Sequence, residues 1–283
     1  MKTPKNISAR NFIFPKRDGI LRAGICRAIQ RILAGLVLLS PVFALAGPPF
    51  LTDDPEPVEY QHWEFYVASQ HAKTSDGWAG TAPHIELNYG AIPNLQLHLI
   101  APLSYNAPEH GAAQYGYGDT ELGFKFRFIE ENKYWPQVAI FPLVEAPTGS
   151  SRRGLGGGEW QAFLPVWLQK SFGEWTLYGG AGYGINPGAG NENWGFGGLV
   201  LQRDISKNIL VGAEIYHRTA TESGGESDTA FNVGAVVNFS DLHHLLISAG
   251  RSIDGPTEFQ AYIAYQFTFG PELFQSVSAT HPH

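Results

Sequence analysis

The sequence predicts an all-β fold, an antiparallel transmembrane β-barrel of about twelve strands. Long segments of the chain alternate between apolar and polar residues with a period of two, as a strand with two different faces does. The connections between these segments alternate in turn between short and long. A third observation agrees with both: after residue 46 the chain is rich in aromatic residues, yet no stretch is long and apolar enough for a membrane helix.

The first 46 residues have the pattern of a secretory signal peptide. Met1 to Arg31 carries eight basic residues and one acid, and Ile32 to Ala46 is an apolar run that contains Pro41. The run closes with the small residues Ala44 and Ala46 before Gly47, as cleavage sites do. A membrane anchor is the alternative, but the 15 residues of the run fall short of the roughly 20 that a spanning helix needs. We therefore expect cleavage between Ala46 and Gly47.

The chain that follows this cleavage site is acidic and has no cysteine. It has 237 residues, 11 of them basic and 25 acidic, and its formal net charge is −14. The one cysteine, Cys26, lies in the leader, so disulfides, thiolate metal sites and cysteine catalysis are excluded for the rest. An acidic chain without basic clusters is also a poor match for nucleic-acid binding. No linker or change of composition divides residues 61–269, which indicates one domain.

The predicted strands are nine to fourteen residues long. Every second residue is apolar in 85–89, 95–103 and 231–239, and the clearest alternation lies in 121–128 and 259–269. A tilted strand needs about 9–11 residues to cross a bilayer, whereas strands of soluble proteins average about 5–6. The lengths therefore favour a membrane barrel. In chain order the segments are residues 61–72, 82–90, 94–105, 118–130, 135–146, 158–171, 174–185, 193–203, 208–219, 228–239, 243–252 and 258–269.

The connections on one side of the predicted barrel are short, and those on the other side are mostly longer and rich in glycine, serine and proline. This is the pattern of outer-membrane barrels, which have short periplasmic turns, longer extracellular loops and an even strand number. The predicted location is therefore the cell outer membrane. A soluble β-sandwich is the alternative, but it has no reason to keep this rhythm. The short connections are 91–93, 131–134, 172–173, 204–207 and 240–242, and the longer ones include 73–81, 106–117, 147–157 and 220–227.

Aromatic residues cluster at the ends of the predicted strands on the outward face. Aromatic girdles are expected at both membrane interfaces, because tryptophan and tyrosine rings are apolar with a polar edge. In this register Trp63, Trp175, Phe239, Phe267 and Phe269 fall near periplasmic ends, and Tyr105, Trp160, Tyr183 and Trp194 fall near extracellular ends.

Three motifs give the chain a resemblance to a known family. They are Pro49-Phe50-Leu51-Thr52-Asp53-Asp54, the stretch GDTELGFKFR at 118–127 and the stretch PLVEAPTG at 142–149. In order and spacing they resemble the outer-membrane barrel family named for the MetA pathway of phenol degradation, and the resemblance covers most of the chain after residue 46. It implies an outer-membrane barrel and the passive uptake of small compounds, aromatic or hydrophobic ones included. It supplies no catalytic residues.

Ionisable residues on the inward face of the strands are the candidate pore lining. An ion in hydrocarbon costs several kcal/mol, so these side chains have to face the lumen or an interface. They either select solutes by charge or brace a small barrel through ion pairs, with Glu121, Lys125 and Arg127 reaching Glu86 or Glu145. Twelve strands enclose less space than the 16–18 of general porins, which favours a narrow, gated or substrate-specific channel. The candidates are Glu64, His84, Glu86, His98, Glu121, Lys125, Arg127, Glu145 and Glu214.

Two further segments flank the predicted barrel at 61–269. Residues 47–60 contain four prolines and four acids, and they form either a small plug in the lumen or a disordered periplasmic lead-in. Residues 270–283 form a C-terminal tail. Many barrels end on the terminal aromatic residue that the barrel assembly machinery recognises, whereas here the tail follows Phe269.

The predicted function is a channel for small-molecule solutes, surrounded by outer-membrane lipid and without a cofactor or metal. A structural or surface-interaction barrel is one alternative, although predicted loops of five to twelve residues are short for that role. A membrane-embedded lipid hydrolase is another, since Ser248 and His217 are available as nucleophile and base, but nothing in the sequence pairs them. Adjacent residues of a strand point to opposite faces, so His243 and His244 cannot easily share a metal ion. We do not expect an enzyme.

Overall fold

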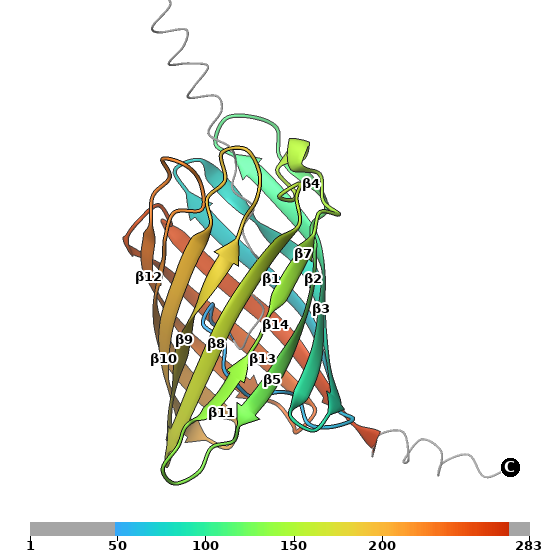
Figure 1. The fold of residues 1–283 in the computed structure, drawn as a ribbon, viewed down its shortest axis with the longest axis vertical. Coiled ribbons are helices and arrows are strands. Elements are labelled where there is room, and N and C mark those ends of the chain that lie inside the picture. Colours follow the sequence, from blue (N-terminus) through green and yellow to red (C-terminus); the bar gives the residue numbers. More distant parts are fainter. Residues whose placement is uncertain (1–48, 272–283) are drawn as a thin grey trace, which may run out of the picture. The chain divides into compact units, whose positions relative to one another are not determined.

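The computed structural model describes residues 49–271 (Figure 1). The predicted signal peptide, its cleavage site at Ala46 and Gly47, and residues 272–283 of the predicted tail lie outside the described residues. Within residues 49–271 no helix is long and apolar enough to span a membrane. The strands, in chain order, are β1 (Trp63–Thr74), β2 (Gly77–Ile92), β3 (Leu95–Pro108), β4 (Gln114–Tyr117), β5 (Thr120–Ile129), β6 (Gln137–Ile140), β7 (Leu143–Ala146), β8 (Gln161–Phe172), β9 (Trp175–Ile185), β10 (Trp194–Ser206), β11 (Ile209–Arg218), β12 (Asp228–Asn238), β13 (His243–Asp254) and β14 (Phe259–Phe269), and the 3-10 helix η1 (Ser151–Arg153) lies between β7 and β8.

The strands form one closed antiparallel barrel. Apart from β4 with β5 and β6 with β7, strands that follow one another in the chain pair with each other. β1 also pairs with β14, so that Trp63 lies opposite Phe269 and Lys73 lies opposite Phe259. Because the first and last strands pair along their length, the wall is closed at this seam. β14 ends at the lower end of the barrel in Figure 1, which is the end where β1 begins. This end carries the short turns and is the periplasmic end.

The fourteen strands correspond to twelve membrane crossings, because two of the crossings are each divided into two strands. β4 and β5 both pair with β3 and are one crossing interrupted at Gly118 and Asp119. β6 and β7 both pair with β5 and β8 and are one crossing interrupted at Phe141 and Pro142. Proline has no backbone N–H to donate to a neighbouring strand, which accounts for the second interruption. The predicted twelve-stranded barrel is confirmed.

The alternation of the sequence corresponds to the two faces of the wall. On β5 the side chains of Leu122, Phe124 and Phe126 are exposed on the outside, whereas Glu121 and Lys125 are buried inside. The same pattern recurs around the barrel, so a band of exposed leucine, valine, isoleucine and phenylalanine covers the outer surface. A soluble protein does not expose so large an apolar surface, and in a membrane barrel this band faces lipid.

The first extracellular connection is much shorter than expected. β2 begins at Gly77, and only Ser75 and Asp76 separate it from β1, so the loop predicted at 73–81 is wrong. The glycines of this stretch have a packing role within the strand: a Cβ atom at Gly80 would lie 1.9 Å from the backbone oxygen of Gln70. The connection predicted at 106–117 likewise shrinks to 109–113, because β4 pairs with the upper part of β3.

One of the predicted girdle aromatics lies on the other face of the wall. Trp194 is 2% exposed and points into the lumen, where its ring stacks on that of Phe163. The prediction fails because β10 is apolar or glycine at nearly every position near its start, so its sequence does not show which face is inside. Four other predicted girdle residues, Trp160, Trp175, Tyr183 and Phe239, are exposed on the outside. Trp63 stacks on Tyr89 and Phe269 at the periplasmic end.

Candidate functional site in the barrel lumen

The nine ionisable residues predicted to line a pore lie on the inner face of the wall. Six of them are almost fully buried, and Glu64, Arg127 and Glu145 are partly exposed. The buried six are His84, Glu86, His98, Glu121, Lys125 and Glu214. Their contacts divide them into a group that holds the N-terminal segment and a group that contacts other residues of the wall.

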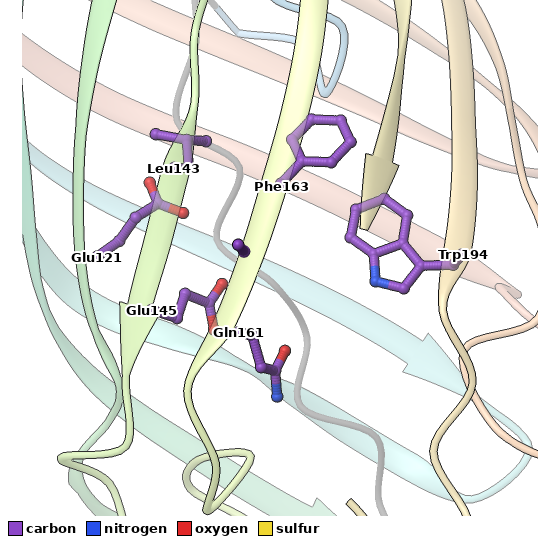
Figure 2. Close-up of a pocket in the computed structure, with 7 residues that line it drawn as sticks. Glu121, Leu143, Glu145, Gln161, Phe163 and Trp194 are labelled. Atoms are coloured by element: carbon purple, nitrogen blue, oxygen red, sulfur yellow. The ribbon is translucent and has the colours of Figure 1, made fainter. Parts of the chain in front are cut away.

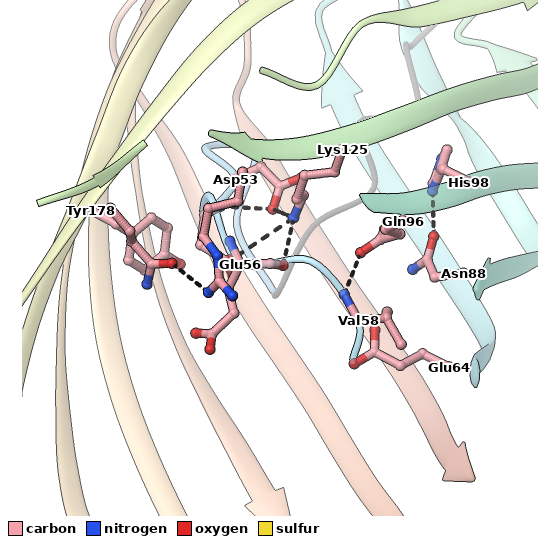
Figure 3. A network of polar contacts seen from close by, with 12 residues as sticks. Asp53, Glu56, Val58, Glu64, Asn88, Gln96, His98, Lys125 and Tyr178 are labelled. Carbon is pink, nitrogen blue, oxygen red and sulfur yellow. Dashed lines mark hydrogen bonds and ion pairs between the residues drawn. The ribbon is translucent and has the colours of Figure 1, made fainter. Parts of the chain in front are cut away.

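The N-terminal segment, residues 49–60, lies inside the lower half of the barrel. It enters at the periplasmic end, where Tyr60 bridges Gly90 at the end of β2. Further in, the backbone N–H of Val58 donates to the side-chain oxygen of Gln96 at 3.0 Å (Figure 3). The hydroxyl of Ser248, on β13, donates to the backbone oxygen of Pro49. The described part of residues 47–60 therefore lies within the lower lumen and is hydrogen-bonded to the wall at both of its ends.

Lys125 holds this segment through its acids. Its Nζ lies 3.1 Å from Asp53 Oδ1 and 3.5 Å from Asp54 Oδ1, and it also donates to the backbone oxygen of Glu56 at 3.4 Å (Figure 3). The ammonium group lies 5.0 Å from the ring centre of Phe141, within the range of a cation–π contact. The expected pairing of Lys125 with Glu86 or Glu145 is wrong, because the acids of the N-terminal segment reach it instead.

Glu214, on β11, holds the same segment through its backbone. The carboxylate accepts the N–H of Thr52 at 2.6 Å and that of Leu51 at 3.3 Å, and it accepts the side-chain amide of Asn232 at 2.6 Å. Buried backbone N–H groups need an acceptor, and an extended segment in a barrel has no neighbouring strand to provide one. Glu214 therefore supplies the acceptor that a strand would otherwise supply.

Three glycines of the wall make room for the segment. A Cβ atom at Gly212 would lie 3.0 Å from the ring of Phe50, and one at Gly234 would lie 3.1 Å from it. At Gly198 the Cβ atom would lie 1.8 Å from Thr52 Oγ1. Phe50 packs with Tyr178 and Val200 in the space that these glycines leave. The motif at 49–54 is therefore the part of the segment that docks against the wall.

A second polar network lies beside the segment, on β2, β3 and β5. His98 Nδ1 lies 2.7 Å from Asn88 Oδ1, and His98 Nε2 lies 2.9 Å from Glu121 Oε1. The Asn88 amide donates to Glu86 at 2.8 Å, so its oxygen faces His98 and Nδ1 of His98 carries a hydrogen. The contact between Nε2 and Glu121 then needs one further proton, on the imidazole or on the carboxyl group. In both cases His98 and Glu121 together carry no net charge.

The remaining predicted residues have local partners. Arg127 donates to Asn94 Oδ1 at 2.7 and 3.0 Å and to Gln137 Oε1 at 3.0 Å, so it ties β5 to the turn before β3. Glu64 accepts the Tyr66 hydroxyl at 2.7 Å. His84 Nδ1 lies 2.7 Å from Thr81 Oγ1.

A recess of about 270 Å³, part of it open to solvent, lies in the upper lumen (Figure 2). Glu121, Glu145 and Gln161 lie at one level on the adjacent strands β5, β7 and β8, because Glu121 pairs with Glu145 and Glu145 pairs with Gln161. Phe163 and Trp194 form the opposite side, with ring centres 4.9 Å apart and an angle of 16° between their planes.

The aromatic side of the recess continues as a cluster along the wall, which the sequence analysis missed. Phe196 stacks on Tyr216 and packs edge-on against Phe163 and Trp167. On β8 the alternation could not reveal this, because Phe163 and Trp167 face inward while Leu164, Val166 and Leu168 face outward. Both faces of that strand are apolar, so only the position of β8 in the folded wall shows which aromatic residues line the lumen.

The other two family-like motifs meet at the extracellular end. The carboxylate of Asp119, in the motif at 118–127, accepts the backbone N–H of Gly149 at 2.8 Å and that of Gly157 at 2.6 Å. Thr148, in the motif at 142–149, donates to the backbone oxygen of Gly118 at 2.9 Å. These contacts hold the loop 147–160 against the interruption between β4 and β5.

The residues considered for a metal site or a hydrolase do not come together. His243 contacts Tyr265 and His244 contacts Asn238, as expected for side chains on opposite faces of a strand. Ser248 contacts Pro49 inside the barrel, whereas His217 is exposed on the outside beside Thr229. Within residues 49–271 no group of three or more His, Cys, Asp or Glu side chains could hold a metal ion.

Comparison with known proteins shows the fold only. No protein-family model matches the sequence, and no curated protein matches it. The chain is similar in structure to the COG4313 outer membrane channel from Pseudomonas putida F1, with a TM-score of 0.64, 19% identity, and coverage of 76% of this chain and 98% of that one. OmpF of Salmonella typhi, solved in complex with daunomycin, has a TM-score of 0.39, 8% identity, and coverage of 74% of this chain and 96% of that one. A TM-score this low adds nothing to the fold assignment.

The closed barrel and its apolar outer surface settle the location. Backbone polar groups have to be satisfied internally in lipid, and a closed antiparallel barrel achieves this with strands alone. Such barrels belong to the outer membrane. The protein is therefore an outer-membrane β-barrel, with outer-membrane lipid around its wall.

Proposed function

We propose that the protein is an outer-membrane channel for the passive passage of small molecules, with the N-terminal segment as its gate. The observation that carries this proposal is how the segment is held. Its main polar contacts run from Asp53 to Lys125 and from the backbone at 51–52 to Glu214, whereas the wall is closed by hydrogen bonds between its own strands. Displacing the segment therefore opens the lumen without breaking the wall.

The upper lumen supports the same proposal. We assign the nine ionisable residues to the lining of a path through the barrel. Lys125 and Glu214 hold the gate, and the other seven line the path around the gate. The aromatic cluster of Phe163, Trp167, Trp194, Phe196 and Tyr216 supplies a surface for small aromatic or hydrophobic solutes. This composition agrees with membership in the MetA-pathway family, which the three motifs support and which we include in the proposal.

The signal peptide and the assembly pathway belong to the same proposal. Export through residues 1–46, with cleavage after Ala46, places Gly47 two residues before the docked Pro49. The rings of Phe267 and Phe269, 5.1 Å apart at the end of β14, offer an aromatic end that the barrel assembly machinery would recognise.

Permeation by a reconstituted barrel tests the proposal. We expect liposomes that carry the wild-type protein to take up arabinose slowly. A Lys125→Met/Glu214→Gln barrel should take it up several-fold faster, because the two main polar anchors of the segment are lost. Heat-modifiable migration on a denaturing gel shows that each barrel is folded. If folded wild-type and variant barrels both leave uptake at the level of empty liposomes, the channel proposal is wrong.

The alternatives are less well supported. A hydrolase needs a nucleophile beside its base, and Ser248 and His217 lie on opposite faces of the wall. A surface-interaction barrel needs large outer loops, whereas three of the six outer connections, at 75–76, 109–113 and 255–258, are two to five residues long. The longest one, 147–160, is held to the wall by Asp119 and Thr148. Neither has an observation in its favour comparable to the docked segment.

A further inference from the structure

We propose that the recess of the upper lumen binds the ammonium group of a small primary amine. This inference rests on the proposed function in one respect, since the amine has to enter the lumen from outside. It goes further by naming a binding site and a chemical class of ligand. Four features of the recess carry it: its charge, an unpartnered amide, its aromatic side and its size.

The recess holds an acidic side chain, Glu145, that no basic side chain of its lining balances. His98 and Glu121 together have no net charge, because one proton is shared between them. Glu145 lies directly beside Glu121, and in residues 49–271 no hydrogen bond or ion pair is found for its carboxylate. The residues that line the recess include the two acids Glu121 and Glu145 and no basic side chain. A carboxylate in such a place favours a cationic ligand.

Gln161 supplies a polar group without a protein partner. Its side chain is 4% exposed and lines the recess beside Glu145, yet neither its amide oxygen nor its amide nitrogen has a hydrogen-bond partner within residues 49–271. Buried amides normally make hydrogen bonds, so this one is available for a ligand. An ammonium group has three N–H donors, and the Gln161 oxygen and the Glu145 carboxylate accept two of them.

The aromatic side of the recess depends on a glycine. Phe163 and Trp194 both pair with Gly184 on the strand between them. A Cβ atom at Gly184 would lie 2.1 Å from the indole of Trp194, so the indole lies over the position where a side chain would be. This lets Trp194 reach Phe163 and form the stack. The two rings offer an apolar surface for the carbon part of an amine and a π-face for its charge.

The size and the donor set distinguish between cations. The enclosed part of the recess admits about one water-sized group, which fits a primary ammonium head and excludes a bulky quaternary one. Divalent metals need more oxygen ligands than this, about six for either magnesium or calcium. No group of three or more acids and histidines is present within residues 49–271 to supply them. The ligand class is therefore a small organic cation with a primary amine.

Calorimetric titration of the detergent-solubilised barrel tests this site. Benzylammonium is the probe, and benzyl alcohol is its neutral counterpart with the same ring. We expect the wild-type barrel to bind benzylammonium with an affinity about tenfold or more above that for benzyl alcohol. Glu145→Gln should weaken benzylammonium binding by about tenfold or more, and Gly184→Ala should weaken it by displacing Trp194.

Two matched controls separate the site from general effects. Glu159→Gln removes an exposed loop carboxylate, and Gly195→Ala adds a Cβ atom that would lie 3.8 Å from its nearest neighbour, so both should bind like the wild type. Equal affinities of the wild type for the two probes, or undiminished benzylammonium binding by a folded Glu145→Gln barrel, would overturn the site. If Glu145→Gln does not fold, the comparison of probes on the wild type decides. Arabinose uptake by liposomes is measured separately, so failure of the site and failure of the channel are distinguishable.

Discussion

At the residue scale, the charged side chains Lys125 and Glu214 of the wall contact the N-terminal segment and not other charged side chains of the wall. The alternation of apolar and polar residues was sufficient to predict that Lys125, Glu121 and Glu214 face inward, because an ion on the lipid face is too costly. It could not predict that Asp53 is the partner of Lys125. That contact joins residues 72 positions apart, and a segment without strand periodicity gives no sign of where it docks.

Loss of the Lys125 anchor should expose the segment. The chain after residue 46 has no cysteine, so a Thr52→Cys variant carries a single thiol at a position that is fully buried in the wild type. We expect this thiol to react slowly with a water-soluble maleimide. Adding Lys125→Met should make it react about tenfold faster or more, because breaking one partner of a buried ion pair costs about 3–5 kcal/mol.

Lys133→Met is the matched control for this labelling. Lys133 is an exposed turn lysine near Tyr134 and does not contact the segment. It should leave the labelling rate of Thr52→Cys unchanged. A labelling rate that Lys125→Met also leaves unchanged would show that the ion pair does not hold the segment.

At the scale of the elements, strand number and order followed from the sequence because each crossing repeats the same period and the same alternation of connections. The errors lie where that signal weakens. The stretch 77–81 contains two glycines, which by themselves indicate a loop, although close packing against β1 requires glycine at Gly80. The predicted orientation of β10 is wrong because residues 194–201 are apolar or glycine on both faces of the strand.

The contacts of Asp119 give a prediction for the loop 147–160. Asp119→Ala removes the acceptor of the Gly149 and Gly157 N–H groups, and each unsatisfied group costs about 1–3 kcal/mol. The loop should loosen, and trypsin should cleave after the exposed Arg152 or Arg153 several-fold faster. Asp76→Ala, in the hairpin turn between β1 and β2, is the control and should not change that rate. Equal cleavage in both variants would contradict a holding role for Asp119.

At the scale of the whole molecule, the wall of the barrel and the segment inside it are held by separate sets of contacts. Pairing of β1 with β14 closes the wall without any contribution from residues 49–60. The segment instead fills the lower lumen, below the recess of Glu145 and Trp194. In the proposed function the segment moves as the gate while the strands stay in place, so that one small barrel can be closed and still serve as a channel.

A reversible covalent lock tests this account most directly. A Cβ atom at Gly198 would lie 3.1 Å from the Cβ of Thr52, close to the roughly 3.5–4.5 Å of a disulfide. In a Thr52→Cys/Gly198→Cys barrel reconstituted in liposomes, oxidation should hold the segment in place and reduce arabinose uptake to the level of empty liposomes. Reduction of the disulfide should restore uptake to at least the wild-type rate. Equal uptake in the oxidised and reduced states would contradict the claim that the N-terminal segment gates the barrel.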